Sequence, residues 1–154
     1  MMLRSLVRQP VAEVRAGCPA CRGAPRSTRY DCGMPSTVEL AVDTYIRACN
    51  EREPGARAAM IDACFASDGR MVTRSREIRG RAALAAMLDR FLADPQLLRI
   101  RLISAIDARG TTFRYRAVAD FRDGTSAESF DAGEIDNNGQ ISLILTFAGP
   151  LQDA

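Results

Sequence analysis

The second half of the chain alternates apolar and polar residues in four consecutive segments, as is typical of β-strands with one buried face. Asp123-Gly124 separates the second segment from the third, and Asn138-Gly139 separates the third from the fourth. Such turns favour antiparallel hairpins. The pattern therefore predicts an antiparallel meander whose apolar face must be covered by a second layer. The expected strands cover residues 98–107, 112–121, 126–136 and 140–147.

Helical segments earlier in the chain can supply that layer. Ser36-Thr-Val-Glu39 is a capping box, and apolar residues then recur at helical spacing. The fold class is predicted to be α+β: a cone of three N-terminal helices packed on a curved, mostly antiparallel β-sheet, a cystatin-like roll with a conical cavity. The expected elements are helices over 36–50, 56–65 and 81–93 and a short strand over 70–74.

Asp131 lies in the third strand of the meander, where it shares a face with Ala127, Ser129, Gly133 and Ile135. We expect this carboxyl to face the cavity. Poor solvation there would raise its pKa and leave a neutral group that donates a hydrogen bond to a ligand oxygen. The alternative is a strand residue that bonds to solvent or pairs with an arginine.

The absence of histidine excludes several kinds of site. All 21 basic residues are arginine. Without imidazole, Ser-His-Asp and Cys-His catalysis and histidine-ligated zinc are ruled out. The five cysteines are an odd number, which does not suggest a secreted disulfide framework. Cys49 and Cys64 lie on apolar helix faces and are expected to be small core residues.

The net charge of +2 is unevenly distributed. Residues 1–33 carry six arginines against two acids, a balance of +4, whereas residues 34–154 carry fifteen against seventeen, a balance of −2. The second region therefore shows no basic excess, which argues against nucleic acid as a partner. No apolar run suits a membrane span or a signal peptide, so we expect no membrane partner and a cytoplasmic location.

Residues 1–33 are expected to be a disordered or non-native extension, and residues 34–154 the domain. The extension contains Cys18-Pro-Ala-Cys21. A zinc site would need two more ligands, and only Cys32 lies nearby in the sequence, so a chance pair is favoured over a metal or redox site. Met34 is expected to be the natural start or the domain boundary.

The order of these elements, together with four short motifs, resembles the nuclear-transport-factor-2-like superfamily and, within it, the SnoaL-like group. The likeness covers residues 36–151 and implies an α+β cone with a pocket and a homodimer formed through the sheet. The superfamily includes ketosteroid isomerases, polyketide cyclases, epoxide hydrolases and pocket proteins. The motifs are Tyr45-Ile-Arg-Ala-Cys-Asn50-Glu-Arg52, Cys64-Phe65-Ala-Ser-Asp68-Gly69-Arg-Met-Val72, Ile78-Arg79-Gly80-Arg81-Ala-Ala-Leu84 and Leu145-Thr-Phe147-Ala-Gly149-Pro150.

The likeness to ketosteroid isomerase implies roles for two residues. Tyr45 matches the oxyanion-binding tyrosine and Asp131 the protonated aspartic acid. Thr73 stands near the position of the general base, and threonine cannot abstract a carbon-bound proton near neutral pH. The Asp-Arg-Asp set of the epoxide hydrolases is not matched either, because Val118 and Leu143 stand beside Arg116 where acids are expected. Tyr45 is alternatively a core aromatic whose hydroxyl bonds to Asp131 or water.

Two groups of arginines have open alternatives. The strand arginines 99, 101, 114 and 116 lie on the polar face, where they bind an anion or, as we favour, pair with Asp120, Glu128 and Glu134. Arg74, Arg76 and Arg79 with Glu77 are expected in a mobile loop at the pocket mouth, where they could attract a carboxylate.

We therefore expect a SnoaL-like pocket protein for a mostly apolar or polycyclic, oxygen-bearing molecule, with no cofactor and no metal. One alternative is an isomerase or cyclase that stabilises an enolate with Tyr45 and Asp131. Another is a protein-interaction module that uses the sheet face. The expected ligand-binding residues are Tyr45, Met71, Thr73, Phe113, Tyr115, Ala117, Asp131 and Phe147.

Overall fold

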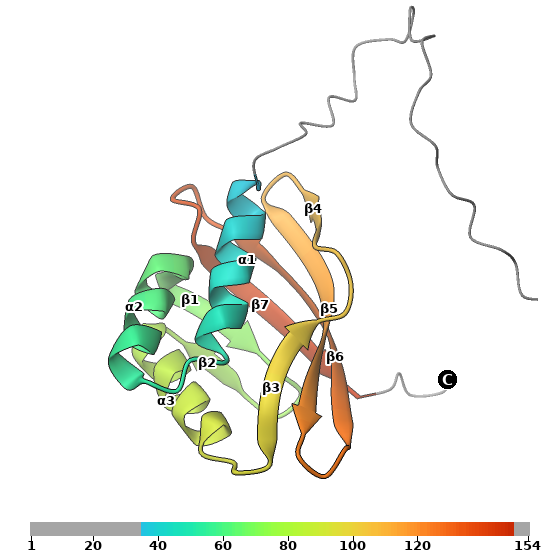
Figure 1. Cartoon of the computed structure of the whole chain (residues 1–154). Helices are drawn as coiled ribbons and strands as arrows, with labels where there is room; N and C mark the ends of the chain where they lie inside the picture. The colour runs from blue at the N-terminus through green and yellow to red at the C-terminus, as the bar shows by residue number, and fades with distance from the viewer. Residues whose placement is uncertain (1–34, 150–154) are drawn as a thin grey trace, which may run out of the picture. The chain divides into compact units, whose positions relative to one another are not determined.

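The computed structural model describes residues 35–149, so the predicted extension over 1–33 and its Cys18–Cys21 pair lie outside the described residues. Three helices pack against one face of a curved seven-stranded sheet (Figure 1). The helices are α1 (Thr37–Ala48), α2 (Pro54–Cys64) and α3 (Arg81–Leu92). The strands are β1 (Phe65–Val72), β2 (Glu77–Arg79), β3 (Leu97–Leu102), β4 (Asp107–Arg109), β5 (Thr112–Phe121), β6 (Ser126–Ile135) and β7 (Ile141–Ala148).

The sheet has the order β2-β1-β7-β6-β5-β3, with β4 paired to β5 as well. All of these pairs are antiparallel except β1 with β7, which is parallel. Strands β3, β5, β6 and β7 form the predicted meander, and the parallel pair joins it to the β1–β2 hairpin. The α+β prediction is therefore confirmed, with β1 and β2 extending the sheet beyond β7.

The helix starts follow from local capping. Ser36 begins α1 with the predicted capping box, since its Oγ accepts from the Glu39 amide and its own amide donates to Glu39 Oε2. Helix α2 begins at Pro54, two residues before the predicted start. Proline suits the first turn of a helix, and the Glu53 carboxylate accepts hydrogen bonds from the amides of Gly55 and Ala56.

The prediction that the second helix continues to Phe65 is wrong. Phe65 already has an extended backbone and begins β1, where it pairs with Ile141 of β7. The pairing register then shifts between Phe65 and Arg70, so β1 is a longer and more irregular strand than the predicted 70–74. Its single parallel partner lies far away in the sequence, where local periodicity carries no signal.

The prediction of one strand over 98–107 is also wrong, because the chain leaves the β5 ladder between β3 and β4. Ser104 explains the break: its side-chain oxygen accepts the hydrogen bond of the Arg116 amide, at 2.8 Å, in place of a backbone carbonyl. Similarly, the loop expected around Glu77 is the ordered β1–β2 hairpin, in which Glu77 pairs with Arg70 and Arg79.

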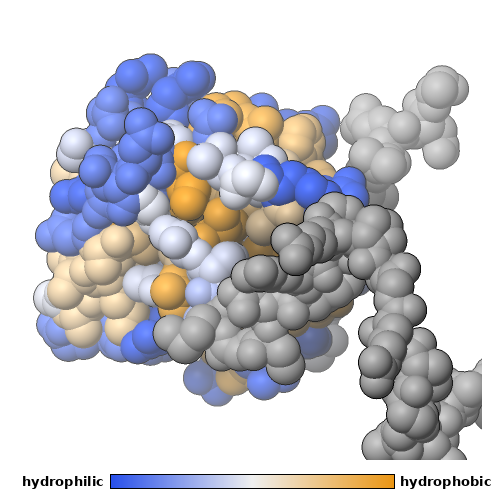
Figure 2. Space-filling view, turned by 90° about the horizontal axis from the view of Figure 1, so that it is seen from above, coloured by the Kyte–Doolittle hydropathy of each residue, from blue (hydrophilic) through white to orange (hydrophobic). Residues whose placement is uncertain are grey.

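The core lies between the helices and the sheet. Phe113 and Tyr115 of β5 are buried there with their rings stacked, 6.0 Å between centroids and 7° between planes. Cys49 and Cys64 are buried free thiols. Figure 2 shows hydrophilic residues around a smaller hydrophobic group on the face seen from above. Among the described residues, no helix is long and apolar enough to cross a lipid bilayer.

Candidate functional site

A cavity of about 240 Å³ lies between the sheet and the helices α1 and α3. Most of its sheet side comes from β5, β6 and the end of β7, with one residue each from β1 and β3, and its helix side comes from α1 and α3. Mostly apolar concave sites with a few polar groups are typical of small-molecule binding sites. The apolar wall includes Ile46, Met71, Met87, Phe91, Ile100 and Phe121.

At the polar end of the cavity, Asp131 and Thr146 line its wall, and Tyr115 is buried in the core beside them. The three side chains lie opposite one another on adjacent strands. Tyr115 pairs with Asp131 across β5 and β6, and Asp131 pairs with Thr146 across β6 and β7. The Tyr115 hydroxyl, Asp131 Oδ1 and the Thr146 hydroxyl are all buried without a hydrogen-bond partner among the described residues. Asp131 Oδ2 accepts one long bond, 3.4 Å, from the Ser129 hydroxyl. Buried polar atoms are rarely left unpaired, so this row can hold a polar ligand atom.

The electrostatics of Asp131 follow from its burial, with 6% of the residue exposed. Desolvation raises the pKa of its carboxyl, and the neighbouring hydroxyls of Thr146, Tyr115 and Ser129 only partly oppose that rise. Asp131 also forms no ion pair with any arginine of the described chain. A carboxyl in this environment holds its proton to higher pH than an exposed one and can then donate a hydrogen bond.

Tyr45 comes from the buried face of α1 and lines the same cavity. Its hydroxyl lies 3.9 Å from the Met71 sulfur, which is a weak acceptor. Burial raises the pKa of Tyr45 well above its usual range, and the nearby Cys49, Tyr115 and Asp131 raise it further. Tyr45 is therefore a protonated phenol whose single hydrogen is engaged only by a weak acceptor, so a ligand oxygen could take that hydrogen bond instead. Burial likewise raises the pKa of the Cys49 thiol to about 12, so this cavity residue is a poor nucleophile.

Four of the eight residues expected to bind a ligand line the cavity: Tyr45, Met71, Ala117 and Asp131. Thr73, Phe113, Tyr115 and Phe147 do not. Phe113 and Tyr115 are packed in the core beside it. Thr73 lies after β1, where its hydroxyl donates to the Arg76 carbonyl and accepts from the Arg76 amide.

Phe147 was expected to line the cavity but does not, because side chains alternate along a strand. Thr146 faces Asp131, so Phe147 lies on the outer face of the sheet, with 55% of its surface exposed. It contacts Phe130 of β6 there, with 6.3 Å between ring centroids.

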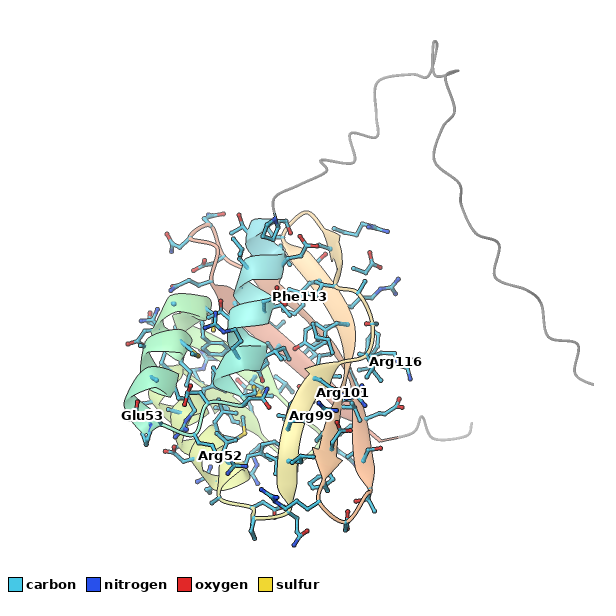
Figure 3. All side chains as sticks on the ribbon, viewed as in Figure 1. Arg52, Glu53, Arg99, Arg101, Phe113 and Arg116 are labelled. Atoms are coloured by element: carbon cyan, nitrogen blue, oxygen red, sulfur yellow. The ribbon has the colours of Figure 1, made fainter. Side chains whose placement is uncertain are left out.

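The outer face also carries the strand arginines, and Figure 3 shows Arg116 projecting away from the helices. Arg99 and Arg101 share Asp120, and Arg116 pairs with Glu128, as favoured from the sequence. Arg114 pairs with Asp107 instead of Glu134. The reason is the short strand β4, which brings Asp107 opposite Arg114.

Sequence reasoning missed Thr146, Met87 and Phe91 as cavity residues. A two-residue turn at Asn138-Gly139 would also predict that Thr146 lies opposite Asp131. The loop is in fact one residue longer, since the Asp136 amide donates to the Gln140 carbonyl, and a register shift between Glu134 and Ile135 restores the pairing. Met87 and Phe91 belong to the apolar face of α3, and the position of that face over the sheet depends on tertiary packing.

The three helices and the curved sheet define an α+β fold that encloses a cavity, as the sequence predicted. No protein-family model matches the chain, and no curated protein matches it. Among solved structures, a candidate isomerase of the SnoaL-like family from Agrobacterium tumefaciens is similar at a TM-score of 0.67. It is 22% identical, over 74% of this chain and 98% of that one.

Two further structures have the same fold. An LEH-like epoxide hydrolase of M. tuberculosis gives a TM-score of 0.57 at 18% identity, over 73% of this chain and 83% of that one. A protein of unknown function with a cystatin-like fold, from Methylobium petroleophilum, gives a TM-score of 0.62 at 18% identity. The match covers 76% of this chain and 78% of that one. The fold is therefore the one shared by SnoaL-like and other nuclear-transport-factor-2-like proteins.

Proposed function

We propose that the chain binds a mostly apolar small molecule that carries an oxygen, and that this oxygen accepts a hydrogen bond from Asp131. The observation that carries the proposal is the Asp131 carboxyl, buried at the end of an apolar cavity with Oδ1 unpaired. A ligand oxygen at this position would accept a hydrogen bond from the protonated carboxyl and so give Oδ1 a partner. Tyr45 of α1 supplies a second donor to the same cavity.

A saturated bicyclic ketone, 2-decalone, tests the proposal because its oxygen can only accept. We expect binding at pH 5, measured by calorimetry, to weaken about tenfold in Asp131→Ala and by a smaller factor in Tyr45→Phe, since each loses one hydrogen bond. Asp120→Asn, on the outer face, is the matched control and should bind as the wild type does. Equal affinity of Asp131→Ala and wild type would refute the proposal.

A second candidate is an isomerase or cyclase that stabilises an enolate. It is favoured by two potential donors that line the same cavity, the buried Tyr45 phenol of α1 and the Asp131 carboxyl of β6, whose pKa burial raises. The base is the missing part, because Thr73 is engaged by Arg76 outside the cavity. Turnover of a β,γ-unsaturated cyclic ketone to its conjugated isomer, lost in Asp131→Asn and Tyr45→Phe, would establish the enzyme. Binding without turnover supports the pocket protein alone.

For the outer face we propose a homodimer rather than a different protein partner. Phe130 and Phe147 lie next to each other on adjacent strands, and 41% and 55% of their surfaces are exposed to solvent. Arginines of β5 lie beside Glu128 and Glu134 of β6, so a second copy related by a two-fold axis can match opposite charges. A cytoplasmic location remains part of the same proposal.

A further inference from the structure

Tyr115 is buried in the core beside the cavity and does not line it. Only 2% of the residue is exposed, and its hydroxyl oxygen has no hydrogen-bond partner among the described residues. Its ring stacks on that of Phe113, which holds it in place. A buried hydroxyl is rarely left unpaired, so this one needs an acceptor within the core.

Asp131 is the acceptor that the strand register provides. It lies directly opposite Tyr115 in the β5–β6 ladder, and its Oδ1 is likewise buried without a partner. Burial raises the pKa of Asp131, and the Tyr115 hydroxyl is one of the neighbours that oppose this rise. Tyr115 can therefore donate to the carboxyl from the core, while the ligand approaches it from the cavity.

Such a hydrogen bond favours one protonation state of Asp131. A hydroxyl donates more strongly to a carboxylate than to a neutral carboxyl, because hydrogen bonds to an ionised group are about twice as strong. The Tyr115 hydroxyl therefore stabilises the charged form of Asp131. A carboxylate has no hydrogen to donate, so this is the form that cannot bind a ketone oxygen.

The other titratable groups that face Asp131 are neutral up to about pH 9. From β5, Tyr115 has a pKa that burial raises well above its usual range, and the same holds for Tyr45 of α1. Burial raises the pKa of the Cys49 thiol, also on α1, to about 12. None of the three therefore changes its charge where Asp131 does.

The remaining neighbours of Asp131 carry no charge. Strand β7 contributes the Thr146 hydroxyl and β6 itself the Ser129 hydroxyl, and the cavity residues of β1, β3 and α3 are all apolar. The Glu128 carboxylate pairs with Arg116 on the outer face of the sheet. Within the described chain, Asp131 is thus the group whose ionisation changes the polar end of the cavity.

We infer that Tyr115 is a positioning residue: without touching the ligand, its hydroxyl holds the Asp131 carboxyl and sets the pH at which the cavity stops binding a ketone oxygen. The ligand part of this inference rests on the proposed function, because it takes Asp131 as the donor to the ligand. The site then releases its ligand as pH rises, and Tyr115 places that release at a lower pH than Asp131 alone would.

The direct test is the titration of the Asp131 carboxyl in the ligand-free protein, followed by NMR of protein labelled with carbon-13 at the aspartate carboxyl carbons. Asp131→Asn assigns the signal. In Tyr115→Phe we expect the midpoint to lie at higher pH than in the wild type, because the carboxylate loses a donor. Phenylalanine keeps the ring that stacks on Phe113, so the packing is preserved. An unchanged or lower midpoint overturns the inference.

Tyr45→Phe is the matched control, since it removes the hydroxyl of the other buried tyrosine of the domain. The Tyr45 hydroxyl lies against the Met71 sulfur, so its loss should leave the midpoint of Asp131 where it is in the wild type. A midpoint that moves equally in both variants would mean that the shift is not specific to Tyr115, and it would overturn the inference.

The affinity for 2-decalone as a function of pH, measured by calorimetry, gives a second readout. One pH unit above the wild-type midpoint, Tyr115→Phe should bind about threefold more tightly than the wild type, because more of its Asp131 keeps the proton. Tyr45→Phe should instead bind more weakly than the wild type at every pH. Weaker binding by Tyr115→Phe at every pH is what a merely structural role would give, and it overturns the inference.

The two proposals can fail separately. Binding of 2-decalone that depends on Asp131, with the same midpoint in the wild type and in Tyr115→Phe, overturns this inference and leaves the proposed function standing. A wild type that does not bind 2-decalone at pH 5 overturns the proposed function and the ligand part of this inference, even where the carboxyl midpoint shifts as expected.

Discussion

Tyr115 and Asp131 lie directly opposite each other on β5 and β6, both buried, and neither the phenol oxygen nor Asp131 Oδ1 has a hydrogen-bond partner among the described residues. The β5–β6 register, set by the turn that contains Asp123-Gly124, brings them together, and the β6–β7 register places Thr146 on the other side of Asp131. The strand pairing therefore places two buried oxygens without hydrogen-bond partners side by side at the polar end of the cavity.

This burial makes the stability of the domain depend on pH. Burial raises the pKa of Asp131 in the folded state above its value in the unfolded chain. The folded state therefore keeps the proton longer, and stability falls as pH rises from the unfolded pKa through the folded one. Asp131→Asn removes this charge, so we expect the stability of the variant relative to the wild type to increase as pH rises from 4 to 8. Thermal melts across this range measure the difference. A difference that is constant with pH would contradict the raised pKa.

Gly133 is expected to be indispensable for a steric reason. A Cβ there would collide with the Leu143 carbonyl oxygen and lie 2.7 Å from the Phe113 ring. Gly133→Ala should therefore lower the free energy of unfolding by about 3 kcal/mol. Gly124→Ala is the contrasting variant, because Gly124 has a φ of +84° but open space around it. It should cost about 1 kcal/mol from backbone strain alone. Urea melts in which Gly124→Ala lowers the free energy of unfolding by more than Gly133→Ala does would refute this account.

Asn50 ties the end of α1 to the edge strand β3. Its side-chain amide donates to the carbonyls of Ile46 and Ile100, at 2.8 and 2.9 Å, and its oxygen accepts from the Ile100 amide at 2.7 Å. Asn50→Asp replaces the donor with an oxygen that faces two carbonyls. We expect a loss of about 2–3 kcal/mol in chemical denaturation. Asn137→Asp, in an exposed turn, should change stability by less than about 0.5 kcal/mol, and equal losses would contradict the assignment.

The outer face of the sheet gives a prediction about assembly. If Phe130 and Phe147 lie in a homodimer interface, Phe130→Glu should shift the protein to a monomer in sedimentation velocity. Leu40→Glu is a matched control, because Leu40 is also a large apolar residue with 53% of its surface exposed, but it lies on α1. A wild type that is monomeric at high concentration would refute the dimer, as would a dimer that survives Phe130→Glu.

The helices and the meander could be predicted from the sequence because their signals are local: the Ser36 capping box, the apolar spacing along α1 and the Gly-containing turns. The strand β1 could not, since its partner β7 lies about seventy residues away and the register shifts after Phe65. Asp131 could be placed on the inner face because it shares that face with Ala127, Ser129, Gly133 and Ile135, whereas the opposite face carries Glu128 and Glu134.

Phe147 could not be placed in the same way. The face of Ile141, Leu143, Leu145 and Phe147 on β7 is entirely apolar, whereas the other face carries Ser142 and Thr146, so periodicity predicts Phe147 on the inner side. The register places Thr146 opposite Asp131 instead, which puts Phe147 on the outer face. Met87 and Phe91 come from α3, and their position over the cavity depends on how that helix packs.

The central claim is that Asp131 acts as a neutral donor to a ligand oxygen, and the affinity of 2-decalone as a function of pH tests it most directly. A ketone accepts a hydrogen bond from a protonated carboxyl and cannot do so from a carboxylate. Calorimetry from pH 4 to pH 9 should show wild-type affinity falling by about tenfold as Asp131 loses its proton. Asp131→Asn donates through its amide and should give a flat profile. A flat wild-type profile, or one that rises with pH, would contradict the account.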